Sequence, residues 1–193
     1  MSEASAQIPN NQRDQNDLDI GTHAAYIFES NADKQRKLFA LCRNIVDIKN
    51  GGLLYIAGKQ GVKGIRLSLI DTGFDVSSYQ RSDQLMIVDS EEWFLTSGRA
   101  PQFKSLDELE SMFRKAASDT LDAGYSYLTV ISETDMLVRK GFLEKYKEFD
   151  LLLSRKIRSL RATCVCAFDK RELQAAGVAD PASSVSDSHS ILI

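Results

Sequence analysis

The sequence predicts an α/β domain: a three-layer fold with a mainly parallel sheet and helices on both faces. Two observations support this prediction. Short, continuously apolar runs alternate along the 193-residue chain with segments of helical periodicity, and glycines or polar capping residues stand between them. Strands that are separated by helices pair in parallel, because each connection crosses back over the sheet.

The first residues predict a tail followed by one domain. Residues 1–19 are rich in Ser, Asn, Gln and Asp, so a disordered polar tail is expected ahead of a single domain over 20–193. Residues 20–30 are mixed in polarity and are expected to pack as an arm or a short strand. A helix should follow, because Asn31 or Asp33 can cap it and apolar residues then recur on one face.

The next elements are two apolar strands with a glycine turn between them. The strand at 53–57 ends in a glycine-rich turn, Gly58–Gly64, which leads into a helix. Residues 74–80 are expected to be extended, and 85–88 form a second apolar strand. The acidic segment 89–92 is typical of a helix start.

Two helices and a strand are predicted in the third quarter of the chain. Ser105-x-x-Glu108 is a capping box, in which each side chain accepts a hydrogen bond from a backbone N–H group at the start of a helix. An apolar strand is expected at 127–131. The segment from Gly141 to Arg158 is the clearest amphipathic helix in the chain.

The last part of the chain contains a fourth apolar strand at 163–168 and a short helix at 169–176. Residues 180–188 are polar and are expected to form a loop. A last short strand is predicted at 191–193.

Composition narrows the class of protein. The net charge of −3 argues against a general nucleic-acid binder, and no apolar run approaches the ~18 residues that a membrane span needs. The polar start of the chain is unlike a signal peptide, and three cysteines do not make a disulfide framework. A cytoplasmic protein is therefore expected.

The glycine turn stands where α/β nucleotide-binding domains cradle phosphate, but its spacing differs from theirs. Counting the phosphate-loop motif from Gly58 puts Lys63 where the second glycine belongs and Gly64 where the lysine belongs. Ile65 then replaces the Ser or Thr that holds Mg²⁺. The pattern favours binding or sensing over catalysis, and for Gly58 and Gly61 a ligand cradle and a plain tight turn remain equally open.

Two acidic residues follow predicted strands, at the sheet edge where ligands bind in parallel sheets. Glu133 comes directly after an apolar strand and is either a functional acid or a helix cap. Asp169 ends the fourth strand and is either a ligand contact or a helix N-cap.

The cysteines and histidines give no catalytic pairing from spacing alone. Cys164 and Cys166 are separated by one residue on a predicted strand, so both point to one face of the sheet. They are either core residues or include a reactive, ligand-sensing thiol. A C-x-C pair falls short of a zinc site, and nothing in the sequence identifies a metal. His23 and His189 are the only histidines, near opposite ends of the domain.

A series of short motifs follows a recognisable order between residues 23 and 193. They are His23-x-x-Tyr26, Gly52-Leu53-Leu54-Tyr55-Ile56, Leu69-x-x-x-Gly73-Phe74-Asp75-Val76, Gln84-Leu85, Trp93-Phe94-Leu95, Ala123-Gly124, Ser132-Glu133-x-x-Met136, Cys166-Ala167-Phe168-Asp169 and a closing His189. In this order they resemble the MEDS domain, a sensory domain named for methanogens, methylotrophs and a dichloromethane-responsive repressor.

The resemblance implies a RecA/KaiC-like, Rossmannoid α/β fold that has lost a working phosphate loop. It implies a role in sensing small molecules, proposed to be simple hydrocarbon derivatives, in signal transduction and transcription control. Carried over residue by residue, it nominates as pocket residues His23, Tyr26, Glu133, Cys166, Asp169 and His189. The histidine and tyrosine would hydrogen-bond a polar group, and Cys166 would supply a polarizable contact.

We therefore expect a non-enzymatic sensor that needs no cofactor and contacts neither nucleic acid nor membrane. Its output would pass through a signalling protein, such as a histidine kinase or a transcription regulator, or through a homo-oligomer. Two alternatives stay open: a degenerate KaiC-like nucleotide binder or weak ATPase that uses the turn Gly58–Gly64 and Glu133, and a ligand-independent protein-interaction module.

Overall fold

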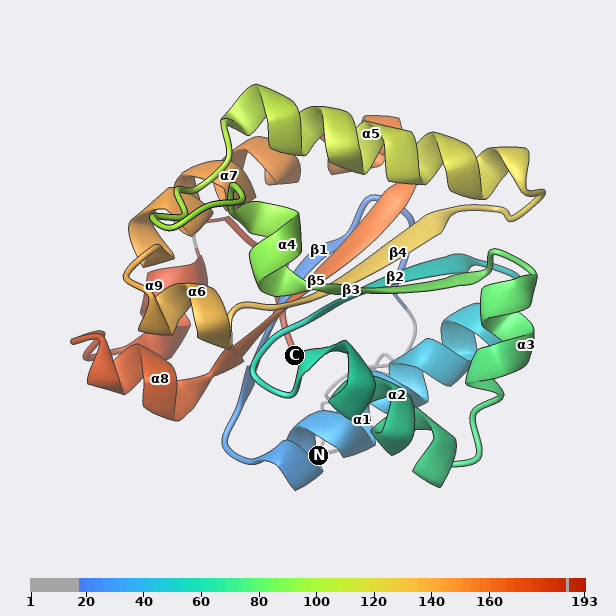
Figure 1. Ribbon diagram of the computed structural model, residues 1–193, viewed down its shortest axis with the longest axis horizontal. Helices are drawn as coiled ribbons and strands as arrows, with labels where there is room; N and C mark the ends of the chain where they lie inside the picture. The colour runs from blue at the N-terminus through green and yellow to red at the C-terminus, as the bar shows by residue number, and fades with distance from the viewer. Residues whose placement is uncertain (1–17, 187) are drawn as a thin grey trace, which may run out of the picture.

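A six-stranded, all-parallel sheet forms the centre of the structure, a computed structural model that describes residues 18–186 and 188–193 (Figure 1). The strand order is β3-β2-β4-β5-β1-β6. The strands are β1 (His23–Phe28), β2 (Gly52–Ala57), β3 (Leu85–Asp89), β4 (Leu128–Glu133), β5 (Ala162–Asp169) and β6 (Ile191–Leu192). The predicted α/β class and the parallel sheet are confirmed.

Helices cover both faces of this sheet, which gives the three predicted layers (Figure 1). One face carries α1 (Asn31–Arg43), the π-helical turn η1 (Asn44–Ile48), α2 (Gly61–Asp71) and α3 (Val76–Arg81). The other face carries α4 (Ser90–Phe94), α5 (Leu106–Asp122), α6 (Asp135–Arg139), α7 (Leu143–Lys156), the 3₁₀ turn η2 (Ile157–Leu160), α8 (Lys170–Ala175) and α9 (Pro181–Ser186). Within the described residues, no helix is both long and apolar enough to span a membrane.

The central strands β2, β4 and β5 are largely apolar because helices bury them from both sides. Every residue of β2 and of β5 is buried. Alternation along β2 sends Leu54 and Ile56 into the core under α5 and α7, while Leu53 and Tyr55 enter the core under α1 and α2. We call these two sides of the sheet the α7 face and the α1 face.

The helix starts follow from side-chain caps. The Ser105 hydroxyl accepts a hydrogen bond from the Glu108 amide at 3.2 Å, which confirms the predicted start of α5. Helix α1 is capped by Ser30, whose hydroxyl accepts from the Asp33 amide at 3.1 Å, and not by the predicted Asn31 or Asp33.

Residues 20–30, expected to be an arm or a short strand, contain the strand β1, which lies inside the sheet and pairs with β5 on one side and β6 on the other. Two other predicted segments differ in the structure. Residues 74–80 contain α3, which is capped by the Asp75 carboxylate, and 180–188 contain α9, which the Asp180 carboxylate caps in the same way. Both short helices are polar, so their starts depend on a cap that apolar periodicity does not reveal.

The predicted tail 1–19 lies mostly outside the described residues. Its last two residues are described and they pack against the domain. Leu18 is buried, and the carbonyl of Asp19 accepts a hydrogen bond from the Thr163 hydroxyl at 3.0 Å. Leu18 and Asp19 thus pack with the domain, and the boundary at residue 20 stays a prediction.

Candidate functional site

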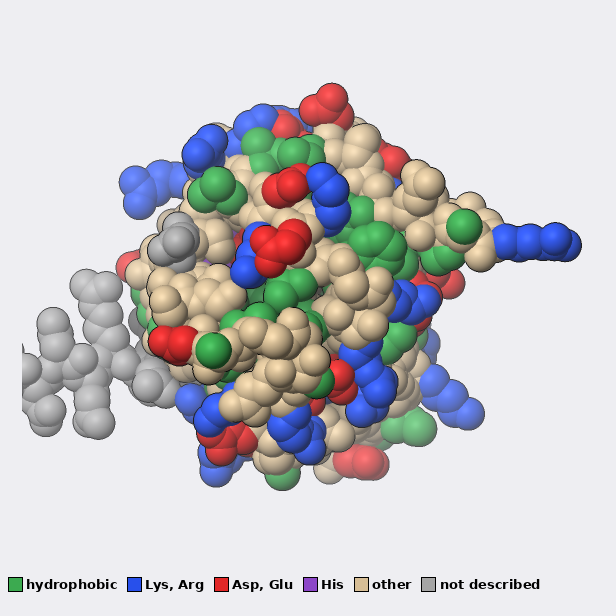
Figure 2. Space-filling view, turned by 90° about the vertical axis from the view of Figure 1, so that its left-hand side faces the viewer, with side chains coloured by type: hydrophobic (Ala, Val, Ile, Leu, Met, Phe, Trp, Pro, Cys, Tyr) green, Lys and Arg blue, Asp and Glu red, His purple; other side chains and the backbone are tan. Residues whose placement is uncertain are grey.

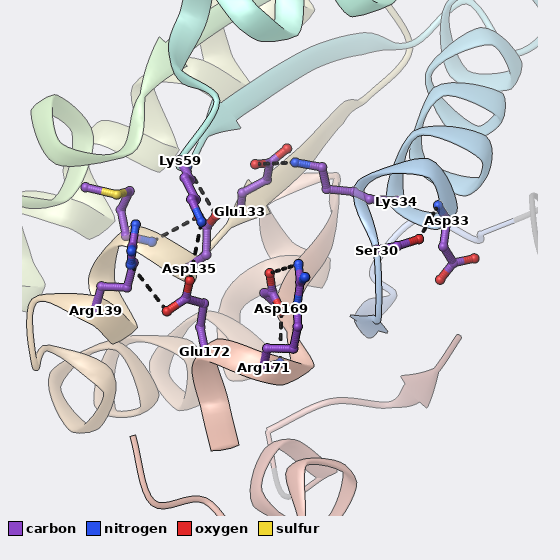
Figure 3. Close-up of polar contacts among 11 residues, drawn as sticks. Ser30, Asp33, Lys34, Lys59, Glu133, Asp135, Arg139, Asp169, Arg171 and Glu172 are labelled. Atoms are coloured by element: carbon purple, nitrogen blue, oxygen red, sulfur yellow. Dashed lines mark hydrogen bonds and ion pairs between the residues drawn. The ribbon is translucent and has the colours of Figure 1, made fainter. Parts of the chain in front are cut away.

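The carboxyl edge of the sheet carries a buried acid, Glu133, at the end of β4 (Figure 3). Its carboxylate accepts a hydrogen bond from the Tyr55 hydroxyl at 2.6 Å and forms an ion pair with Lys34 Nζ of α1 at 2.9 Å. The Gly58 amide donates to the same carboxylate at 3.3 Å. Glu133 and Lys34 are both almost fully buried, so the protein itself satisfies this acid on the α1 face.

The glycine turn packs against a second acid, Asp135. The Asp135 carboxylate accepts from the Lys59 amide at 3.1 Å, and a Cβ added at Gly58 would lie 1.8 Å from Asp135 Oδ1. Burial raises the pKa of Asp135, and the charge of Glu133 adds to that increase. Gly61 adopts φ +63, a left-handed conformation that favours glycine. Close packing and turn geometry thus account for both glycines, and a ligand at this turn remains a prediction.

The other acid predicted at this edge, Asp169, caps α8. It accepts from the Arg171 amide at 2.9 Å and pairs with the Arg171 guanidinium at 3.1 Å (Figure 3). Burial opposes ionisation of Asp169, but the hydrogen bonds from Arg171 outweigh it and lower its pKa. Nearby, Arg139 and Lys59 both pair with Glu172. Figure 2 shows acidic and basic side chains interspersed over the side of the molecule that carries α6, α8 and α9.

A second polar cluster lies on the α7 face. It consists of His23 of β1, Asp150 of α7, Cys166 of β5 and His189, which follows α9; we call it the His–Cys cluster. The His23 Nε2 atom lies 3.0 Å from Asp150 Oδ1 and 3.3 Å from Cys166 Sγ. Cys166 Sγ lies 3.2 Å from Asp150 Oδ1, and His189 Nε2 lies 3.3 Å from Asp150 Oδ2. The side chains of His23, Asp150 and His189 are 2% exposed or less, and Cys166 is fully buried.

Strand pairing brings these residues together although they are far apart in sequence. In the parallel pair of β1 and β5, His23 lies opposite Cys164 and Ala25 lies opposite Cys166. The segment with His189 is held beside β1 because the Ser190 amide donates to the His23 carbonyl at 2.7 Å. The two histidine rings consequently lie 4.3 Å apart.

The charges and burial in the cluster favour an ion pair between His23 and Asp150 and a neutral thiol at Cys166. Burial opposes protonation of His23, but Cys166 and Asp150 outweigh it and raise the pKa of the imidazole. Burial also opposes ionisation of Asp150, yet the hydrogen bond and charge of His23 lower the pKa of the carboxyl. Burial raises the pKa of the Cys166 thiol well above its usual value and lowers the pKa of His189.

The cluster does not have the geometry of a cysteine–histidine–aspartate triad. In such a triad the nucleophile contacts one ring nitrogen and the acid orients the other. Here Cys166 and Asp150 both approach His23 Nε2, while Nδ1 has no hydrogen-bond partner among the described residues. With a protonated thiol as well, this arrangement suits binding better than nucleophilic attack.

Sequence reasoning missed Asp150. It lies on the inward face of α7, four residues after Tyr146 and three before Leu153, both of which are buried. The signal was present in the sequence: Asp150 occupies a position on the apolar face of an amphipathic helix. A buried acid at such a position is rare and indicates that a polar partner lies nearby.

The structure divides the eight predicted ligand-binding residues between different places. His23, Cys166 and His189 meet in the cluster on the α7 face. Tyr26 is three residues from His23 on the same strand, so it points to the α1 face, where its hydroxyl donates to Asp33 at 2.7 Å. The remaining four lie at the carboxyl edge: Gly58, Gly61, Glu133 and Asp169.

A groove of about 440 Å³ lies elsewhere, beside the edge strand β3. Its lining includes Met86 of β3, Gln84, and Ala116 and Thr120 of α5. None of the predicted ligand-binding residues borders this groove.

Comparison with known proteins agrees with the architecture. The model of the MEDS family, the MEthanogen/methylotroph, DcmR Sensory domain, matches residues 22–184. A crystal structure of the KaiC-like protein PH0186 from the hyperthermophilic archaeon Pyrococcus horikoshii OT3 is similar, with a TM-score of 0.57 and 10% sequence identity. The similarity covers 77% of this chain and 61% of that one, and at this identity it shows the fold alone. No curated protein matches the sequence.

Proposed function

Because the chain belongs to the MEDS family of sensory domains, we propose that it is a non-enzymatic small-molecule sensor whose sensing element is the His–Cys cluster. One observation carries this proposal. Four side chains that bind ligands in many proteins, from four separate elements, converge in the buried core within 4.8 Å of one another. A core of this kind would be filled by apolar residues if packing were its only task.

The chemistry of the cluster supports a small ligand with one polar or polarizable atom. His23 Nδ1 is buried and has no hydrogen-bond partner among the described residues, so a polar ligand atom there would remove an energetic cost. The Cys166 thiol is soft and polarizable. The rings of Tyr146 and Phe168, which lie close to the cluster, supply an apolar wall. These features suit simple hydrocarbon derivatives such as small amines, thiols and halides.

The position of His189 offers a route from ligand binding to output. His189 lies between α9 and β6, and β6 pairs with β1 through only two residues, Ile191 and Leu192, which remain 40% and 52% exposed. A strand with so few contacts is held weakly. A ligand that changes the cluster geometry would shift this segment and alter a surface for a partner, such as a histidine kinase, a transcription regulator or a second copy of the chain.

The test is a thermal-shift assay of the purified chain with C1–C3 amines, thiols and halides. Ligand binding to the native state raises the midpoint of unfolding, so a saturable rise is expected with at least one of these compounds. The variants His23→Ala and Cys166→Ala should lose that rise. Cys42→Ala is the matched control, because Cys42 is equally buried but belongs to the core of the α1 face.

Nucleotide binding is the alternative that the KaiC-like fold favours, and the same assay decides it. The buried pair of Lys34 and Glu133 gives a reason to expect no rise with ATP and Mg²⁺, because the acid already has three donors. A rise with ATP and Mg²⁺ that is lost in Glu133→Gln would overturn the sensor proposal in favour of a nucleotide binder. A chain that responds to neither set would favour the ligand-independent interaction module.

A further inference from the structure

The His–Cys cluster contains the donor atoms of a transition-metal site. Two imidazole nitrogens, one carboxylate oxygen and one thiol sulfur all lie within 4.8 Å of one another. This donor set suits a borderline ion such as Zn²⁺ and not the hard cations Mg²⁺ and Ca²⁺, which take oxygen ligands.

The spacing of three donors matches one face of a small coordination sphere. The atoms His23 Nε2, Asp150 Oδ1 and Cys166 Sγ form a triangle with sides of 3.0, 3.2 and 3.3 Å. Metal bonds of about 2.0–2.3 Å at tetrahedral angles place neighbouring ligand atoms roughly 3.3–3.5 Å apart. His189 Nε2 lies 3.3 Å from the other oxygen of Asp150, and this histidine would supply the fourth ligand.

The hydrogen bonds of His189 leave a lone pair directed at this centre. Its Nδ1 lies 2.6 Å from the Val185 carbonyl oxygen, which can only accept, so Nδ1 carries the proton. In the neutral ring, Nε2 therefore presents a lone pair, and an oxygen of Asp150, itself an acceptor, lies 3.3 Å from it. Nε2 has no hydrogen-bond partner among the described residues. Two acceptors that face each other in a buried site call for a cation between them.

The surroundings of His189 and Asp150 also resemble those of metal ligands. A histidine that binds a metal usually donates its second N–H to a carbonyl or a carboxylate, which fixes the ring and its tautomer, as Val185 does here. The Asp150 carboxylate is held in turn by the Ser188 hydroxyl. The ligand atoms are thus oriented from outside the cluster.

We propose that His23, Asp150, Cys166 and His189 bind one divalent transition-metal ion of borderline softness, such as Zn²⁺. This inference rests on the proposed function and names the cofactor class of the sensing element. Binding would replace two protons by the metal, the one on the Cys166 thiol and the one that His23 Nε2 donates to Asp150, and release both to solvent. It would also tie the segment that follows α9 to β1, β5 and α7 through His189.

The experiment uses Co²⁺ as a spectroscopic substitute for Zn²⁺ in the reduced, chelator-treated full chain. Titration should give visible ligand-field bands of a low-symmetry Co²⁺ site and a sulfur-to-cobalt charge-transfer band that saturate at one ion per chain. Elemental analysis after dialysis against Zn²⁺ should give the same stoichiometry. Cys166→Ser should abolish the charge-transfer band, and His189→Asn should weaken Co²⁺ binding at least tenfold.

Cys42→Ser is the matched control, because it removes a buried thiol from the α1 face and should leave the titration unchanged. Circular dichroism of each variant shows that the fold is retained. Substoichiometric Co²⁺ binding, or a charge-transfer band that survives in Cys166→Ser, would overturn the metal proposal. If Co²⁺ fails these tests and small organic ligands still raise the midpoint of unfolding of the metal-free chain, the metal proposal fails while the sensor proposal stands.

Discussion

Replacing Lys34 by methionine tests whether the acid at the carboxyl edge is structural. Lys34 and Glu133 are 1% and 0% exposed at their side chains, and their charged atoms lie 2.9 Å apart. Methionine keeps much of the lysine stem but leaves Glu133 without its counter-charge. Truncating one partner of a buried ion pair typically costs about 3–5 kcal/mol, because the remaining charge is uncompensated.

The contacts of Glu133 place the expected cost at the lower end of that range. The carboxylate keeps two donors, the Tyr55 hydroxyl at 2.6 Å and the Gly58 amide at 3.3 Å. We therefore expect Lys34→Met to lower the free energy of unfolding by about 3 kcal/mol. The double variant Lys34→Met/Glu133→Gln buries no lone charge and should cost about 2 kcal/mol, well below the sum of its two single changes.

Equilibrium unfolding in urea measures these differences, provided that the slopes agree between variants. Lys115→Met is the matched control: Lys115 pairs with Asp119 on an exposed surface of α5, where the cost should stay below about 0.5 kcal/mol. A cost below about 1 kcal/mol for Lys34→Met, or strict additivity in the double variant, would refute the reasoning. Glu133 would then be free to act on a ligand.

Three further changes test the packing at the same edge and the start of α5. Gly58→Ala should lower the free energy of unfolding, measured in urea, by about 1–3 kcal/mol, because its Cβ would lie 1.8 Å from Asp135 Oδ1. The double variant Gly58→Ala/Asp135→Ala should recover part of this loss, and a double variant that recovers none would contradict the clash. Because burial and then the charge of Glu133 raise the pKa of Asp135, its contribution to stability is present at low pH and is lost as the pH rises through the folded-state pKa. Relative to the wild type, Asp135→Asn should therefore be more stable near neutral pH than at about pH 3, and a constant difference would contradict this. Ser105→Ala should cost about 1 kcal/mol through loss of the α5 cap, with faster amide exchange in its first turn as the measurement; unchanged exchange would show that the cap is dispensable.

The fold was predictable where burial leaves a strong local signal. The strands β2, β4 and β5 are buried on both faces, so each reads as an apolar run whose type does not depend on distant contacts. The short helices α3 and α9 were not predictable by the same means, because they are polar and depend on the Asp75 and Asp180 caps. A short strand was one of two expectations for residues 20–30, but the place of β1 inside the sheet was not predictable, since it depends on β5 and β6, far along the chain.

The candidate site was predictable only in part. The resemblance nominated His23, Cys166 and His189, but their meeting depends on contacts across as many as 167 residues, such as the one between His23 and Ser190. Period-two alternation is enough to separate Tyr26 from His23, because an odd spacing on a strand means opposite faces. Asp150 was hidden for another reason: a charged residue in an amphipathic helix is assigned to the solvent side unless its exact position on the helix is checked.

The buried polar groups on the two faces of the sheet differ in how fully they are hydrogen-bonded, and this difference supports placing the proposed sensing element on the α7 face. On the α1 face, Glu133 has a full set of donors from Lys34, Tyr55 and Gly58, so a ligand there would have to displace an ion pair. On the α7 face, a nitrogen of each histidine lacks a hydrogen-bond partner among the described residues. A ligand atom that reaches one of these nitrogens gains a contact without displacing a hydrogen bond that the nitrogen already makes. His189 also lies beside the weakly held strand β6. A ligand bound at the His–Cys cluster would therefore shift β6 and change the surface of the domain.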